Sequence, residues 1–162
     1  MARTYTLSFA GITLANQAVT LAFINPPVSG PALEILRCWV SQNSTTTGAM
    51  LRIQLSTQVS VFPTLVSATP VRHNPGDPVS VIAGGIAGAA GTCGINASAE
   101  GAGAKTVLIP DSFYNLSGWV WVPTPEERIV FNPGGASGFG LHLPAAPATL
   151  TGWSGGITYR EL

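Results

Sequence analysis

The sequence predicts an all-β protein: an antiparallel β-sandwich with jelly-roll-like connectivity, about eight to ten strands and no substantial helix. Residues Met50–Val61 alternate apolar and polar side chains with a period of two, which is the period of a half-buried strand. Proline and glycine interrupt the apolar segments throughout, as is typical of strands joined by turns. An immunoglobulin-like sandwich is the alternative, but such domains are usually shorter, at about 100 residues.

The stretch Gly118–Leu143 carries the strongest strand signals, and we expect the fold to be organised around it. It predicts three consecutive strands, at Gly118–Val122, Arg128–Phe131 and Gly138–Leu143. In the first strand two tryptophans would share one face and two valines the other. In the last strand bulky residues alternate with small or polar ones: Phe139, Leu141 and Leu143 against Gly138, Gly140 and His142.

The remaining apolar segments predict the other strands. Leu33–Gln42 could also form a short helix, but its Cys-Trp-Val sequence and the turn that follows favour a strand. In Met50–Val61 the alternation predicts one dry face and one wet face. Phe62–Pro78, with four prolines, is expected to be a long connection. The full set of expected strands outside the central stretch is Thr4–Ala10, Thr13–Ile24, Leu33–Gln42, Met50–Val61, Lys105–Pro110, Leu150–Trp153 and Ile157–Glu161, with a short apolar piece at Val79–Ile82.

Residues 83–104 form a low-complexity stretch of mainly glycine and alanine with one carboxylate. Their small side chains cannot build a core of their own, and the glycines raise the entropic cost of ordering. We therefore expect one β-sandwich domain over residues 1–162, with a loop or arm at 83–104 that orders in an assembly. A mobile surface loop is the alternative.

The chain is poor in charge. Charged residues make up 9% of the sequence, the formal net charge is zero, and Lys105 is the only lysine. A basic patch for nucleic acid and an apolar run of about 18 residues for a membrane span are both missing, so we expect neither partner. A soluble surface usually carries about 25–35% charged residues. We therefore expect partners to cover part of this surface, as in a homo-oligomer or a larger assembly.

The N-terminus leads directly into a strand pattern, which predicts no secretory signal. Without a secretory signal the two cysteines are expected to be free thiols and not a disulfide. We predict Cys38 to be buried in a strand and Cys93 to lie in a loop.

No motif predicts catalysis, a metal site or a cofactor. Gly101–Lys105 resembles the end of a phosphate-binding loop, but Ala104 stands where that motif needs glycine. His73 and His142 are the only histidines, and neither has further ligands at metal-site spacing. The adjacent pair Glu126–Glu127 would point to opposite faces of a strand, and no G-x-S-x-G elbow is present. We expect the protein not to be an enzyme.

The four tryptophans have two interpretations. Core or subunit-interface packing is the favoured one, because each aromatic ring buries a large apolar area. Stacking on sugars is the alternative, but polar planar groups are sparse around Trp119 and Trp121.

Taken together, the all-β start, the near absence of lysine, the Gly118–Pro144 run and the C-terminal segment Thr151–Leu162 resemble tailed-bacteriophage virion structural proteins. The similarity is greatest to jelly-roll capsid decoration (cement) proteins. It implies a homo-oligomer, with a trimer favoured, that binds across neighbouring copies of the major capsid protein and stabilises the shell. It also implies a place on the capsid exterior after synthesis in the host cytoplasm. The rival expectation is a carbohydrate- or host-binding module of a fibre, tail or baseplate.

The expected assembly contacts lie in the N-terminal segment and in the 83–104 arm. Deleting residues 86–102 would then leave the fold intact and weaken capsid binding. The candidate contact residues are Arg3, Tyr5, Leu7, Phe9, Ile86, Ile95 and Asn96.

Overall fold

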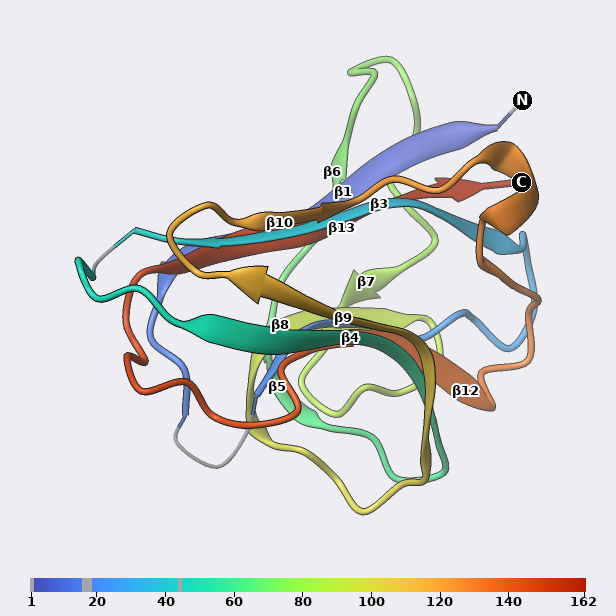
Figure 1. Ribbon diagram of the computed structural model, residues 1–162. Coiled ribbons are helices and arrows are strands. Elements are labelled where there is room, and N and C mark those ends of the chain that lie inside the picture. The colour runs from blue at the N-terminus through green and yellow to red at the C-terminus, as the bar shows by residue number, and fades with distance from the viewer. Residues whose placement is uncertain (1, 16–18, 44) are drawn as a thin grey trace.

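Two antiparallel sheets pack face to face in the computed structural model, which describes residues 2–15, 19–43 and 45–162 (Figure 1). The predicted all-β sandwich is confirmed, and the one described helix is the single 3-10 turn Pro125–Glu127. The described residues hold thirteen strand segments, three of them only two residues long, so the count exceeds the expected eight to ten. Jelly-roll connectivity stays a prediction. No helix in the described ranges is long and apolar enough to cross a membrane.

The six-stranded sheet is built around the C-terminal strand. Its order is β10-β3-β13-β1-β6, and β11 pairs with β3 beside β10. In the register of β1 on β13, Tyr5 faces Tyr159 and Leu7 faces Ile157. The strands are β1 (Arg3–Ile12), β3 (Leu33–Gln42), β6 (Val71–Arg72), β10 (Trp119–Trp121), β11 (Val130–Phe131) and β13 (Trp153–Glu161).

The seven-stranded sheet has the order β5-β8-β2-β12-β4-β9, and β7 pairs in parallel with β8. Its central strand is β12, which pairs with β2 on one side and with β4 on the other. The strands are β2 (Thr20–Ile24), β4 (Met50–Val59), β5 (Thr64–Ser67), β7 (Ala83–Gly84), β8 (Thr92–Ala99), β9 (Lys105–Tyr114) and β12 (Ser137–His142).

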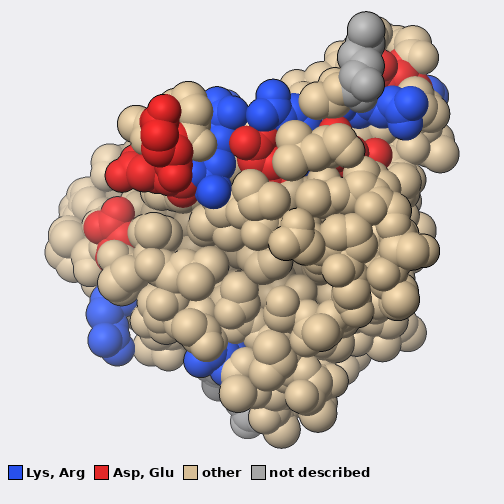
Figure 2. All heavy atoms as spheres, turned by 90° about the vertical axis from the view of Figure 1, so that its right-hand side faces the viewer, with Lys and Arg blue, Asp and Glu red and all other residues tan. Residues whose placement is uncertain are grey.

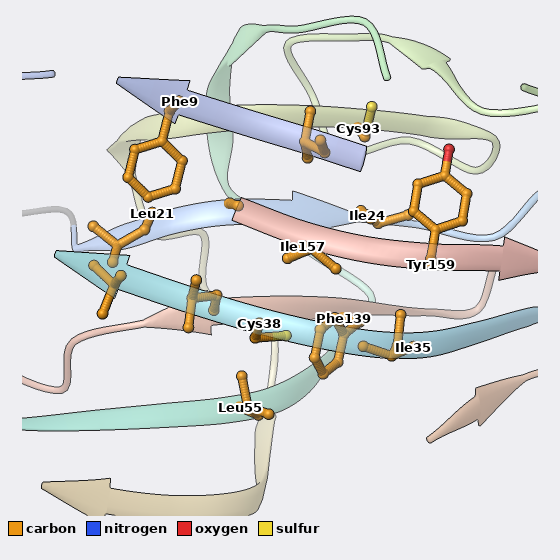
Figure 3. Close-up of a cluster of buried hydrophobic side chains, with 14 of the residues drawn as sticks. Phe9, Leu21, Ile24, Ile35, Cys38, Leu55, Cys93, Phe139, Ile157 and Tyr159 are labelled. Atoms are coloured by element: carbon orange, nitrogen blue, oxygen red, sulfur yellow. The ribbon is translucent and has the colours of Figure 1, made fainter. Parts of the chain in front are cut away.

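The core lies between the sheets and takes alternate side chains from both (Figure 3). Tyr5 and Tyr159 stack with ring centroids 5.7 Å apart, and Phe113 meets Trp153 edge to face. Cys38 and Cys93 are both buried free thiols. Cys93 lies on strand β8, so the predicted loop position is wrong.

The period-two prediction for Gly118–Val122 is confirmed, but its central place in the fold is not. Trp119 is buried, whereas Val120 is 55% exposed and Val122 65% exposed on the opposite face. Strands β10 and β11 occupy one edge of the six-stranded sheet, because the interior of that sheet is already filled by β3, β13 and β1. Only β12 of the predicted three is central to a sheet.

The prediction of a loop or arm at residues 83–104 is wrong for residues 92–99, because β8 is a sheet strand between β2 and β5. The small residues of β8 let the backbones of neighbouring segments approach it closely. A Cβ added at Gly94 would lie 2.7 Å from Leu65 Cβ and 2.7 Å from the Val66 carbonyl oxygen. The accessible surface of 7371 Å² is also close to the value of about 7,600 Å² expected for a compact chain of this mass. Residues 100–104 then cross the end of the sheet to reach β9 at the far edge.

Further boundaries differ from prediction. Strand β2 begins at Thr20 and not at Thr13, and residues 16–18 of that predicted strand lie outside the described residues. The expected connection Phe62–Pro78 contains strands β5 and β6. Strand β9 continues past Pro110 to Tyr114, and β13 runs unbroken through Gly155 and Gly156. The predicted strand Leu33–Gln42 is confirmed.

The outer face of the seven-stranded sheet is partly buried, which corrects the wet face predicted for Met50–Val61. Phe23, Leu65 and Ala97 form a second, smaller apolar cluster there, outside the main core. The ring of Phe23 lies against Gly138, where a Cβ would clash with it. Ser56 and Gln58 on this face are each only 2% exposed.

Candidate functional site

Charged side chains are distributed unevenly. Figure 2 shows acidic and basic groups together along the upper side of the molecule, where the six-stranded sheet lies, above a broad face with few charges. Glu34 on β3, which is 8% exposed, forms ion pairs with Arg128 and Arg160. The Arg128 Nη1 to Glu34 Oε1 distance is 3.6 Å. Glu34 thus offsets one of the two positive charges, and each guanidinium of this group has an acidic partner.

The edges of the two sheets come together on one side of the sandwich, formed by β9, β10 and β11, which we term the open edge. In Figure 1, β10 and β9 lie one above the other there. The Trp119 indole Nε1 on β10 donates to Asp111 Oδ2 on β9 over 2.8 Å, which joins the two edges. Strand β9 pairs only with β4, so one side of its backbone is without a strand partner among the described residues. Pro110 within β9 fits an edge position, because proline cannot donate to a ladder.

The open edge is apolar as well as unpaired. Val107 and Leu108 on β9 are 43% and 37% exposed, and Met50, which pairs with Tyr114 at the other end of β9, is 69% exposed. A long edge strand with exposed hydrophobic side chains is a template for pairing with another chain unless something covers it. The exposed large apolar residues of this surface are Met50, Val107, Leu108, Tyr114, Leu116, Val120, Val122 and Val130.

The predicted N-terminal contacts are corrected by the structure. Tyr5 and Leu7 are fully buried and Phe9 is 5% exposed, because alternate residues of β1 face the core. These three side chains cannot meet a partner without opening the sandwich. Arg3 is exposed at the start of β1, and its assembly role stays a prediction.

The predicted contacts in residues 83–104 lie apart from the open edge. Ile86 is 63% exposed in the connection between β7 and β8. Ile95 on β8 is partly buried against the core. Asn96 has a positive φ of 49°, and its Nδ2 donates to the Thr13 carbonyl over 3.0 Å. The sequence signal for the open edge was the outward-facing valines of β10.

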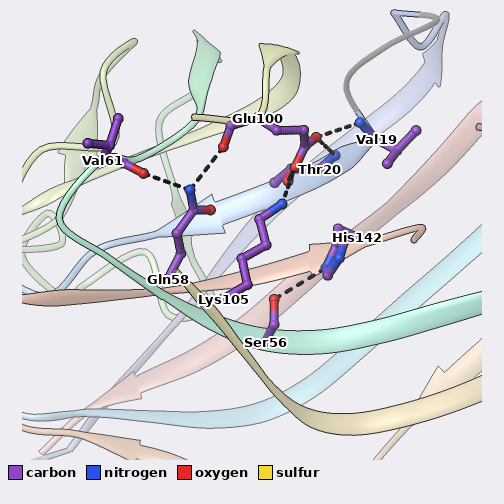
Figure 4. Close-up of polar contacts among 8 residues, drawn as sticks. All are labelled: Val19, Thr20, Ser56, Gln58, Val61, Glu100, Lys105 and His142. Atoms are coloured by element: carbon purple, nitrogen blue, oxygen red, sulfur yellow. Dashed lines mark hydrogen bonds and ion pairs between the residues drawn. The ribbon is translucent and has the colours of Figure 1, made fainter. Parts of the chain in front are cut away.

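A partly buried polar cluster lies at the end of the seven-stranded sheet where residues 100–105 cross it (Figure 4). Glu100 Oε1 accepts from the backbone N–H groups of Val19 and Thr20 at 2.5 and 2.7 Å. Glu100 Oε2 accepts from the Thr20 hydroxyl at 2.7 Å and forms an ion pair with Lys105. Burial alone would raise the pKa of Glu100, but the hydrogen bonds from Lys105 and Thr20 lower it overall.

His142 lies beside this ion pair and is 6% exposed. Its Nδ1 is 3.2 Å from the Ser56 hydroxyl oxygen. Burial lowers the pKa of His142 to about 4, with a further lowering from Lys105, so the ring is neutral at neutral pH. The acid near His142 that the sequence did not show is Glu100, brought there by the fold. The hydrogen bonds of its carboxylate oxygens come from Val19, Thr20 and Lys105, and no described bond joins it to the imidazole.

Three other features bear on the expected site classes. No group of three or more potential metal ligands occurs among the described residues. Trp119 and Trp153 are buried, and Trp39 and Trp121 are only partly exposed. The Arg37 guanidinium covers the ring of Trp39 at 4.8 Å from its centroid. An exposed aromatic platform for sugar is therefore not found in the described part of the chain.

Comparisons with known proteins give no relative: no protein family model, no curated protein and no solved structure matches this chain.

Proposed function

We propose that this protein is a structural subunit of a phage particle that decorates the capsid and stabilises it by binding across neighbouring capsid subunits. The observation that supports the proposal most strongly is the open edge, an unpaired and apolar strand edge on a protein with few charges. The proposal of a phage capsid, and of a position on its exterior, is based on the resemblance of the sequence to jelly-roll decoration proteins.

In this proposal the open edge is the surface by which copies of the chain meet, and the oligomer, with a trimer favoured, is the unit that binds the major capsid protein. A standard interface buries about 800 Å² on each partner, a small part of the 7371 Å² surface. Exposed valines and leucines contribute about 25 cal/mol for each square ångström removed from water. The sparse charge lowers the cost of covering such a surface, because few ions lose their water.

Capsid binding by edge variants tests the proposal. Val120→Glu places a carboxylate in the open edge, at a side chain that already points to solvent. We expect the variant to fold as the parent does, to be monomeric where the parent is an oligomer, and to lose most of its occupancy on capsids lacking the native protein. Val79→Glu is the matched control, since Val79 is 77% exposed in the segment between β6 and β7. Full occupancy by a monomeric Val120→Glu variant would contradict the proposed role of the open edge.

A further inference from the structure

A cavity of about 240 Å³ opens beside the partly buried polar cluster. Glu100, Lys105 and His142 form its polar side, and Val19, Leu143 and residues 144–146 form its apolar wall. The fold therefore brings together the only lysine and one of the two histidines in one cavity. Lys105 begins strand β9 of the open edge, but the chemistry of this cavity does not depend on the assembly proposal.

Glu100 holds the cluster in place and is itself saturated. Its two carboxylate oxygens accept from two backbone N–H groups, one hydroxyl and the Lys105 ammonium. Four donors satisfy most of the acceptor capacity of a carboxylate. Glu100 thus positions Lys105 and has little capacity left to bind a ligand.

Lys105 offers donors to the cavity. An ammonium group has three N–H donors, and the only acceptor for them among the described residues is Glu100 Oε2. The remaining two donors are free for a ligand, since the Lys105 side chain is 25% exposed.

His142 offers a further donor, because Ser56 fixes its tautomer. The Ser56 hydroxyl is buried, and its one described hydrogen-bond partner is His142 Nδ1. A buried hydroxyl that fails to donate is costly, so the hydroxyl donates to Nδ1 and the ring proton lies on Nε2. Nε2 has no partner among the described residues, and it is not one of their buried unpaired atoms, so it is open to the cavity. A ligand that enters the cavity can therefore accept a hydrogen bond from Nε2.

We infer that the cavity binds a single carboxylate group. The unused polar side-chain groups of its lining are N–H donors, two on Lys105 and one on His142, and a carboxylate is an acceptor-only group with two oxygens. Glu100 and Lys105 cancel each other's charge, so the bound carboxylate brings a net negative charge that favours protonation of His142. The carboxylate belongs either to a small free acid or to an acidic side chain of a protein partner.

Formate is the probe for the free acid. The His142 ring signals are followed by ¹H–¹⁵N NMR on the full chain at neutral pH, with formate replacing chloride at constant ionic strength. We expect a saturable shift of the His142 signals, with a dissociation constant no tighter than about 1 mM for so small a ligand. We also expect the pKa of His142 to rise when formate is bound. An identical His142 titration in formate and in chloride would overturn the inference for a free acid.

A blocked tripeptide with a central glutamate, acetyl-Gly-Glu-Gly-amide, is the probe for a partner side chain, and its glutamine counterpart is the control. Binding of the glutamate peptide but not the glutamine peptide assigns the site to a partner's acidic side chain. Binding of formate alone assigns it to a small acid. Failure of both probes to move the His142 signals overturns the inference.

Two variants separate the site from general effects on the fold. Lys105→Met removes the two free donors and should weaken binding by at least about tenfold, in line with loss of a charged hydrogen bond. Ala145→Leu fills the cavity from its exposed rim and keeps every charged group, so it should block binding even if Lys105→Met does not fold. Unchanged binding in the folded Ala145→Leu variant would place the carboxylate elsewhere and overturn the assignment.

Discussion

Replacing Gly94 by alanine should destabilise the protein, because residues 92–99 are a sheet strand packed backbone to backbone on its neighbours. The added Cβ would lie 2.7 Å from Leu65 Cβ, 2.7 Å from the Val66 carbonyl oxygen and 2.8 Å from the Gly85 carbonyl oxygen. Two of these three neighbours are backbone atoms, so β8 must shift away from β5 to make room. Overpacking of this kind costs about 1–3 kcal/mol, which lowers Tm by about 3–10 °C in a chain of this size.

The assay is urea unfolding followed by tryptophan fluorescence, with the m-value compared between variants. Gly76→Ala is the matched control. Its nearest neighbour is the Asn74 side chain at 3.5 Å, an ordinary contact in an exposed turn, so its free energy of unfolding should stay within about 0.5 kcal/mol of the parent. Equal stability of Gly94→Ala and the parent would refute the integral role of β8. For the same reason, deletion of residues 86–102 should abolish folding, in contrast to the expectation from sequence.

Three further predictions address the buried groups and the surface. The pKa of His142 is about 4 in the folded protein against an ordinary 6.5, so the unfolded chain takes up the proton at higher pH than the folded one. The free energy of unfolding should therefore fall by up to about 3 kcal/mol as pH drops from 6.5 towards 4. His142→Gln should remove this part of the pH dependence, and an unchanged dependence of the unfolding free energy on pH would contradict the burial of a neutral ring. Burial raises the pKa of Cys38 and raises the pKa of Cys93 to about 12. Neither thiol should therefore react with a thiol reagent at pH 8 until the protein unfolds. Prompt labelling of the native protein would argue against the burial of these thiols. Sedimentation should show that Val120→Glu shifts the protein to monomer while Val79→Glu does not, and equal behaviour of the two would argue against the open edge as the contact surface.

Local pattern was sufficient to predict the strands that have one apolar face. The alternation in Gly118–Val122 matches the faces observed, because each side chain in a strand points opposite to the next. The strands that the sequence did not predict, β5, β6, β7 and β8, have a weaker alternation of apolar and polar residues. Strand β8 is rich in glycine and alanine because its neighbours approach closely, and the same small residues favour a loop when the neighbours are unknown.

The candidate sites depended on contacts between segments far apart in the sequence. Glu100 and Lys105 approach His142 only because residues 100–105 cross the end of the sheet. The open edge depends on which strand ends each sheet, and strand order is not encoded in the alternation of any single strand. Tyr5, Leu7 and Phe9 were expected at a contact surface, but their period of two is equally that of a core-facing strand, and β1 lies inside its sheet.

The central claim, that copies of this chain meet through the open edge, is tested most directly by the solution mass of the purified protein, measured by light scattering behind a sizing column. The account predicts an oligomer, with a trimer of three 16.7 kDa chains favoured, that Val120→Glu converts to monomer. A parent protein that runs as a monomer over the whole accessible concentration range would contradict the claim.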